Sequence, residues 1–149
     1  MIYLNYKILM RDDPEWLATA ETINNAEWKA AKYLAKKMRT GKFTDWEGIV
    51  IAKDEDIIAG FCSFVKKDIV DSINYTPYVA IVYVDPNYRG RKISKELVKI
   101  SEKQLRRIGF HEVYLVTQHV GLYEKWGYDQ IDQSTDTFGR PMRVLRKFL

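Results

Sequence analysis

The sequence predicts a mixed α/β fold in a single domain over residues 1–149, with a central mixed sheet of about six to seven strands flanked by about four helices. Three observations predict it. The chain has 149 residues, near the commonest size for one domain, and no internal repeat or low-complexity segment interrupts it. Some stretches have apolar residues at helical spacing and others are short apolar runs typical of strands. Helices and strands alternate along the chain, as in folds that pack helices on a sheet.

The N-terminal part is expected to hold one strand and two helices. Residues 2–10 alternate loosely between apolar and polar side chains, and Asp12 to Pro14 are typical of a helix start. From there to about residue 40, apolar residues recur every three or four positions, with an interruption at Asn24 and Asn25. Gly41 then ends the second helix in the manner of a helix C-terminus.

The middle of the chain is expected to form a hairpin, a loop, a buried strand and a helix. Residues 48–52 and 57–65 are the hairpin strands, joined by a polar turn. Residues 66–76 lack periodicity and are predicted to be a loop. The run 77–84 is almost wholly apolar or aromatic, as in a strand buried on both faces. Residues 92–108 have apolar side chains on one helical side and Lys or Arg on the other.

The C-terminal part is expected to add a strand, a short helix and two closing strands. The strand covers residues 112–117, and the helix covers 120–126 and ends at Gly127. The closing strands cover residues 128–133 and 142–148. Together with the preceding elements, these complete the mixed α/β order.

Composition limits the classes of function. The formal charge of +4 and the pI of about 9.0 are compatible with an anionic partner, but 24 basic against 20 acidic residues is too mild for a nucleic-acid signature. Cys62 is the only cysteine, and its phenylalanine neighbours predict a buried thiol, so no intrachain disulfide and a cytoplasmic location are expected. No apolar run approaches the ~18 residues of a membrane span, so no membrane association is expected.

The segment from Val82 to Ser94 is the most informative in the chain. A buried strand ends there in a Pro-containing turn that passes directly into a helix. The first N–H groups of a helix lack intrahelical partners, and the helix dipole adds partial positive charge, so an anion is stabilised at this place. Gly90 permits a close backbone approach. Four basic residues can supply charge to a pyrophosphate: Arg89, Arg91, Lys92 and Lys95. On composition alone, a solvated turn explains them equally well.

Two motifs resemble the GNAT superfamily of N-acetyltransferases, over a stretch from about Gly48 to Tyr128. The acetyl-CoA motif of that family is a strand ending in Val-x-Pro, then an Arg-x-x-Gly-x-Gly/Ala turn and a helix. The matching residues here are Val84, Pro86, Tyr88, Arg89, Gly90, Ile93 and Leu97. Lys92 and Ser94 stand where the family has small residues. The later motif, Leu-Tyr-Glu-Lys-x-Gly-Phe/Tyr, is matched from Leu122 onward.

The resemblance implies a GNAT-like fold and transfer of an acetyl group from acetyl-CoA to a primary amine, by direct attack of the amine on the thioester. It also implies that the central strand splays from its neighbour and turns a backbone N–H toward the acyl carbonyl. The residues that it implies for cofactor binding are Val82, Tyr83, Val84, Arg89, Gly90, Arg91, Lys92, Ile93, Ser94 and Lys95.

Tyr123 is the catalytic residue that the resemblance implies. In the family, the matching tyrosine lies near the thioester sulfur and can protonate the departing thiolate. Packing on the cofactor is the alternative role. The base that deprotonates the amine stays open between Asp71, His119 and a water relayed by either. The two histidines lie eight residues apart with no carboxylate or thiol at ligand spacing, so no metal site is expected.

The acceptor amine is not identified by the sequence. The resemblance places its site in residues 16–43 and 66–77. Asp68 and Asp71 can attract a cationic amine there, or can belong to a solvated loop. Two other functions stay open: a non-catalytic acyl-CoA-binding domain and, ranked last, a basic nucleic-acid-binding domain. A homodimer is also left open. Five aromatic residues can line the acceptor pocket or lie in the core: Trp28, Tyr33, Phe43, Trp46 and Tyr75.

Overall fold

A seven-stranded mixed sheet forms the centre of the computed structural model, which describes residues 3–70 and 72–149. The strand order is β1-β2-β3-β4-β5-β7-β6. Only β4 and β5 pair in parallel; the other described pairs are antiparallel. The strands are β1 (Asn5–Met10), β2 (Gly48–Asp54), β3 (Ile57–Val65), β4 (Tyr78–Val84), β5 (Glu112–Thr117), β6 (Asp129–Thr135) and β7 (Pro141–Phe148). The predicted mixed α/β fold is confirmed.

Three α-helices accompany the sheet: α1 (Trp16–Asn24), α2 (Lys29–Arg39) and α3 (Ile93–Ile108). The fourth predicted helix is instead a short 3-10 helix, η2 (Tyr123–Trp126), because Gly121 and Gly127, both with positive φ, leave too few residues between them for an α-helix. A second 3-10 helix, η1 (Pro86–Tyr88), follows β4. Within the described residues, no helix is long and apolar enough to cross a membrane.

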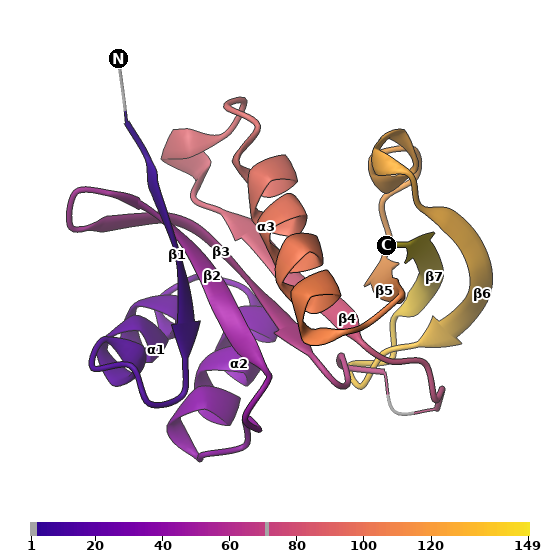
Figure 1. The fold of residues 1–149 in the computed structure, drawn as a ribbon, viewed down its shortest axis with the longest axis horizontal. Coiled ribbons are helices and arrows are strands. Elements are labelled where there is room, and N and C mark those ends of the chain that lie inside the picture. The colour runs from indigo at the N-terminus through magenta and orange to yellow at the C-terminus, as the bar shows by residue number, and fades with distance from the viewer. Residues whose placement is uncertain (1–2, 71) are drawn as a thin grey trace.

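The helices cover the two faces of the sheet (Figure 1). Helices α1 and α2 bury a core that includes Ala20, Leu34 and Ala80 on one face. Helix α3 buries a second core on the other face, where Leu97 meets Val79. Neighbouring residues of β4 therefore point into different cores, as predicted for a strand buried on both faces.

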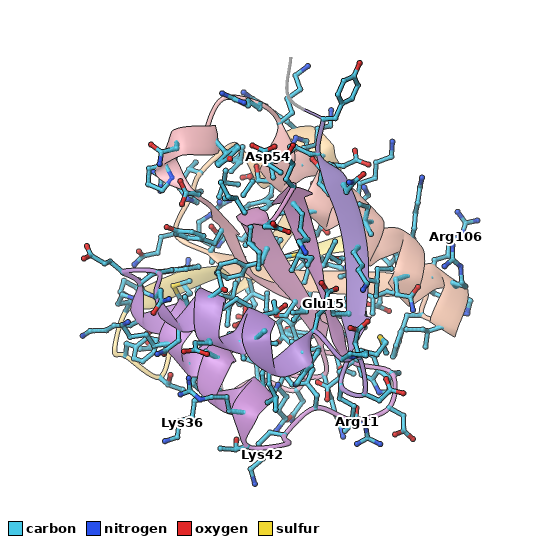
Figure 2. All side chains as sticks on the ribbon, turned by 90° about the vertical axis from the view of Figure 1, so that its left-hand side faces the viewer. Arg11, Glu15, Lys36, Lys42, Asp54 and Arg106 are labelled. Atoms are coloured by element: carbon cyan, nitrogen blue, oxygen red, sulfur yellow. The ribbon has the colours of Figure 1, made fainter. Side chains whose placement is uncertain are left out.

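Contacts at the turn end of the β2–β3 hairpin fix two connections. The Tyr88 hydroxyl of η1 donates a hydrogen bond of 2.7 Å to Asp54, the last residue of β2, which is labelled in Figure 2. Glu15, just before α1, accepts hydrogen bonds from Lys7 at 2.6 Å and from Lys53 at 3.2 Å, and Figure 2 shows it against the ribbon of the sheet. The hairpin thus holds both the turn after β4 and the start of α1 in place.

Candidate active site

The two central strands diverge. Strands β4 and β5 pair at Tyr78 and Tyr114, the one register pair between them in the described chain, with the Tyr114 N–H 2.9 Å from the carbonyl of Pro77. Beyond this pair, side chains of both strands line a shared cavity. The sheet therefore opens along the C-terminal part of β4, as the resemblance implied.

A β-bulge in β4 lies beside this opening. Phe61 of β3 pairs with Tyr83 and Ser63 pairs with Ala80, so two residues of β4 lie opposite Cys62 alone. One of these two, Ile81, has a φ of 56°, which is rare for a β-branched residue. A bulge bends its strand and redirects the side chains and peptide groups around it. The strained backbone thus marks the place where β4 turns away from β5.

The cavity between the strands has a volume of about 780 Å³. The predicted cofactor-binding residues that line it are Val82, Tyr83, Val84, Arg89, Gly90, Lys92, Ile93 and Ser94. Tyr123 lines it as well. The cavity therefore joins the turn after β4 to the later motif, although the two motifs are separated in sequence by the whole of α3.

The turn after β4 is built by local hydrogen bonds. Asp85 caps η1 by accepting a hydrogen bond of 2.9 Å from the Asn87 N–H. The exposed Arg89 side chain donates from Nε to the Val84 carbonyl at 3.3 Å. The chain then enters α3 with no side-chain cap. The first N–H groups of α3 thus lack a capping side chain and lie at the cavity, where they can bind an anion.

Lys92, at the N-cap of α3, has left-handed backbone angles, with φ of 59° and ψ of 25°. A side chain in this region costs about 1–2 kcal/mol, a cost that glycine avoids. The structure thus explains physically why the family prefers a small residue where this chain has lysine. Lysine at this position places a positive charge at the cavity, and its backbone is strained.

The free energy of unfolding of Lys92→Gly should exceed that of Lys92→Ala by about 1 kcal/mol, because only glycine relieves the strain of left-handed backbone angles. Both variants remove the same charge, so the comparison isolates the backbone effect. Urea unfolding followed by circular dichroism measures it. Equal stability of the two variants would mean that the loop adopts another backbone conformation in solution.

Two predicted cofactor-binding residues lie outside the cavity lining. The Arg91 guanidinium lies over the Tyr88 ring, 5.5 Å from its centroid, and is exposed. Lys95 is the third residue of α3 and lines a second cavity of about 400 Å³. That cavity lies between α3 and the segments around Trp126 and Phe148. The helical turn carries Lys95 away from the opening of the sheet, which its nearness in sequence could not reveal.

Tyr123 lies in an aromatic cluster at the edge of the cavity and is 6% exposed. Its ring makes edge contacts with Trp126 at 5.2 Å and Tyr128 at 6.1 Å between centroids. Burial raises the pKa of its phenol above the ordinary value of 10, and Cys62 and Asp68 raise it further. Among the described residues its hydroxyl makes no hydrogen bond, so the proton is available to a bound molecule.

An ion pair between β7 and η2 positions this tyrosine. Arg143 Nη2 lies 2.6 Å from Glu124 Oε2, and the same guanidinium donates to the carbonyl of His119. Glu124 Oε1 also accepts a hydrogen bond of 3.1 Å from the Gly121 N–H. Hydrogen bonding to Arg143 lowers the pKa of Glu124, which keeps the pair charged. The loop that carries Tyr123 is therefore tied to the sheet on both sides.

The candidate bases for the amine have different environments in the structure. His119 is exposed and lines the cavity. Asp71 lies outside the described residues. Asp68, considered from the sequence only as an attractor of an amine, also lines the cavity and is 5% exposed. The loop around it is not a solvated one: Ile69 is also buried, and its carbonyl accepts a hydrogen bond of 2.8 Å from the Thr137 N–H.

The five aromatic residues proposed for an acceptor pocket have different environments. Trp28 lines the cavity, and its ring stacks on Tyr83 with centroids 6.0 Å apart. Phe43 is a core residue in edge contact with Trp16. Three lie outside the cavity lining: Tyr33, Trp46 and Tyr75. Glu27 and Arg140, which sequence patterns did not indicate, complete this side of the cavity.

Among the described residues, no group of three or more His, Cys, Asp or Glu side chains is placed to hold a metal ion. The polar side chains of the cavity are instead spread over separate elements: Asp68 follows β3, His119 follows β5 and Arg140 precedes β7. The site is thus organised around a cavity with separate polar groups.

Three solved structures with low sequence identity share this fold. A chain of the NatC complex bound to Gag peptide and CoA is 19% identical, with a TM-score of 0.71 and 99% of each chain covered. Aminoglycoside 6'-acetyltransferase type Ii is 19% identical, with a TM-score of 0.71, 97% of this chain and 96% of that chain covered. The putative acetyltransferase yncA from Salmonella typhimurium, determined with acetyl-CoA, is 17% identical, with a TM-score of 0.65 and coverages of 98% and 94%. These likenesses show that the fold is shared.

The family model for the acetyltransferase (GNAT) family matches residues 6–128. The chain therefore belongs to the GNAT family of acetyltransferases, and the resemblance found in its two motifs is confirmed. No curated protein sequence matches the chain.

Proposed function

We propose that the chain transfers an acetyl group from acetyl-CoA to a primary amine of a small molecule or protein. The observation that carries this proposal is the cavity between β4 and β5, lined by the N-terminus of α3 at Ser94 and by the Tyr123 ring. The acetyl-CoA-bound yncA structure, which shares the fold, supports the choice of donor. The basic turn and free helix N–H groups suit the diphosphate of this donor.

The positions of the side chains support the catalytic roles that we propose. The β4 segment from Val82 to Val84 lines the acyl and pantetheine part of the donor, and a peptide N–H at the bulge serves as the oxyanion donor. The phenol of Tyr123 donates a proton to the departing sulfur, because expulsion of a thiolate leaves negative charge at that atom. The amine attacks the thioester directly, without a covalent acyl-enzyme.

A reducing compartment, the cytoplasm, suits this activity. Cys62 packs between β3 and α3, where its sulfur lies 3.1 Å from the Ser101 hydroxyl. Burial raises the pKa of the thiol to about 12, so it stays protonated and unreactive. The cysteine is thus a packing residue that needs no disulfide partner.

The test is release of free thiol from acetyl-CoA in the presence of polyamines, aminoglycosides, amino acids and peptides, with acetyl-CoA binding measured by calorimetry. We expect at least one amine class to release thiol above the blank. Binding of acetyl-CoA without release in any arm would favour the alternative, a domain that binds acyl-CoA without turnover.

A further inference from the structure

Three carboxylates are buried in the described part of the chain: Glu47, Asp68 and Asp136. Glu47 accepts hydrogen bonds from the backbone of Thr44 and Lys66, which outweigh the effect of burial and lower its pKa. Asp136 is held in the same way by the backbone and guanidinium of Arg140, and its pKa is also lowered. These two carboxylates have structural partners.

Asp68 differs from both. Its Oδ1 accepts a hydrogen bond of 2.6 Å from the adjacent Ile69 N–H, and no lysine or arginine among the described residues forms an ion pair with it. Lys37, the cation that acts on it, lies instead 3.8 Å from Glu47. Burial therefore raises the pKa of Asp68 from 3.8 to about 7. An incompletely paired buried carboxylate borders the cavity.

Asp68 lies toward the acceptor part of the cavity. Asp68 follows Val65, the last residue of β3, by three residues, and Val65 pairs with Tyr78, the first residue of β4, whereas the turn that suits a diphosphate follows the last residue of that strand. A seven-residue strand is about 20 Å long, so Asp68 and the turn border different ends of the cavity. The exposed carboxylate of Glu27 lines the same cavity, as does the Trp28 ring, which stacks on Tyr83 farther along β4.

We propose that Asp68 binds the ammonium group of a primary-amine acceptor and takes the proton that this amine must lose. This inference rests on the proposed acetyl transfer. The chemical complement of a buried carboxylate and an exposed one on the same cavity is an aliphatic cation, because an ammonium group donates charge-assisted hydrogen bonds to carboxylate oxygens. The acceptor class is therefore an alkyl amine, with a second cationic group favoured by Glu27.

The step balances as follows. Asp68 takes one proton from R–NH3⁺, and the freed nitrogen lone pair forms the C–N bond to the acyl carbon. The C–S bond breaks, and the departing thiolate takes the phenol proton of Tyr123. The nitrogen still carries one proton more than the amide needs, and this proton passes to Tyr123 and restores the phenol. The Asp68 carboxyl then releases its proton to solvent. Ammonium and thioester give amide, thiol and one proton.

The groups that act on Asp68 come from several elements. Lys37 on α2 favours its charged form and Asp136, between β6 and β7, disfavours it. Asp68 in turn raises the pKa of Tyr78 on β4 and of Tyr123 on η2. The last effect places Asp68 within electrostatic reach of the proposed acid. Three further charged or titratable side chains border the same cavity: Glu27, His119 and Arg140.

The first test compares wild type with Asp68→Asn, using acetyl-CoA and 1,4-diaminobutane between pH 5.5 and 9. We expect wild-type kcat/KM to rise with pH through about 7, as the Asp68 carboxyl ionises. The Asn variant should lose this rise and about 10²-fold in kcat/KM at pH 8, with unchanged acetyl-CoA affinity. Asp68→Glu should restore part of the rise. Glu47→Gln, which removes a buried carboxylate outside the cavity lining, is the matched control and should keep it.

The second test is stability, which separates a functional carboxylate from a structural one. Folding raises the pKa of Asp68, so the protonated form is favoured by folding. The resulting stability is complete below about pH 4 and is lost as the pH rises through 7. Asp68→Asn, with no charge to bury, should unfold at a higher temperature than wild type at pH 8, and the difference should shrink toward pH 4.

The outcomes separate failure of the inference from failure of the proposed function. If wild type turns over the amine and Asp68→Asn keeps the rise of kcat/KM through pH 7, the role of Asp68 is overturned and acetyl transfer still stands. If wild type binds acetyl-CoA but turns over no amine, the proposed function fails. Binding of 1,4-diaminobutane at pH 8, measured by thermal shift, then decides about Asp68: stabilisation lost in Asp68→Asn supports amine binding there, and an unchanged shift overturns it.

Discussion

Tyr123→Phe should lower kcat for acetyl transfer about 10²-fold or more, with little change in the affinity for acetyl-CoA. A loss of 10²-fold corresponds to about 2.7 kcal/mol of transition-state stabilisation. The change deletes one oxygen atom and leaves the ring in its edge contacts with Trp126 and Tyr128. Steady-state thiol release and calorimetric binding measure the two quantities separately.

The raised pKa of Tyr123 decides the pH dependence of this effect. Because burial raises the pKa above 10, the phenol keeps its proton at every pH from 6 to 9. We therefore expect no alkaline loss of activity from Tyr123 within that range, and the ratio of wild-type to variant kcat should stay constant across it.

Tyr128→Phe is the matched control, since it removes a neighbouring hydroxyl from the same aromatic cluster. That hydroxyl donates a hydrogen bond of 2.7 Å to Glu102 and is 1% exposed in the core. Its loss should lower the free energy of unfolding by about 1.5–3 kcal/mol, because the acceptor is a carboxylate, but should leave kcat unchanged. If Tyr123→Phe behaves in the same way, Tyr123 packs against the cofactor and is not the acid.

The fold was predictable from local patterns. The run that forms β4 is apolar throughout, and α3 presents Ile93, Leu97 and Leu105 to one core, so both elements begin and end within one residue of their predicted limits. The extra residue at the bulge was not predictable, because Ile81 is a normal strand residue whose left-handed φ depends on pairing with β3. Periodicity contains no signal for such a register shift.

The donor side of the candidate site was predictable from one motif, whereas on the acceptor side the sequence indicated Asp68 and Trp28 as candidates without their environment. The turn and α3 form one continuous segment, so their motif specifies the local geometry. Asp68 is buried because its loop meets Thr137, almost seventy residues later, and its environment includes Trp28 from the α1–α2 connection. A charged residue in an aperiodic segment predicts exposure in general. The apolar Ile69 and Val70 that follow were the available signal for burial.

Ser94→Asp should raise the Kd for acetyl-CoA about 10²-fold and stabilise the free protein slightly. Ser94 is the second residue of α3 and lines the cavity. A carboxylate in the first helical turn is favourable by about 0.3–1 kcal/mol, because it complements the helix dipole. The same charge about 6 Å from a phosphate, at an effective dielectric of about 20, costs roughly 2.8 kcal/mol in binding. Stability and affinity should therefore change in opposite directions.

Ser94→Asn isolates the charge, because asparagine has nearly the shape of aspartate and is also a good residue near a helix start. The difference in Kd between the two variants should shrink as salt is raised from 0.05 to 0.5 M, since screening weakens the repulsion at this partly exposed position. Equal Kd values for the two variants at low salt would place the diphosphate away from α3. The helix N-terminus would then lose its proposed role, although the cavity between β4 and β5 would remain.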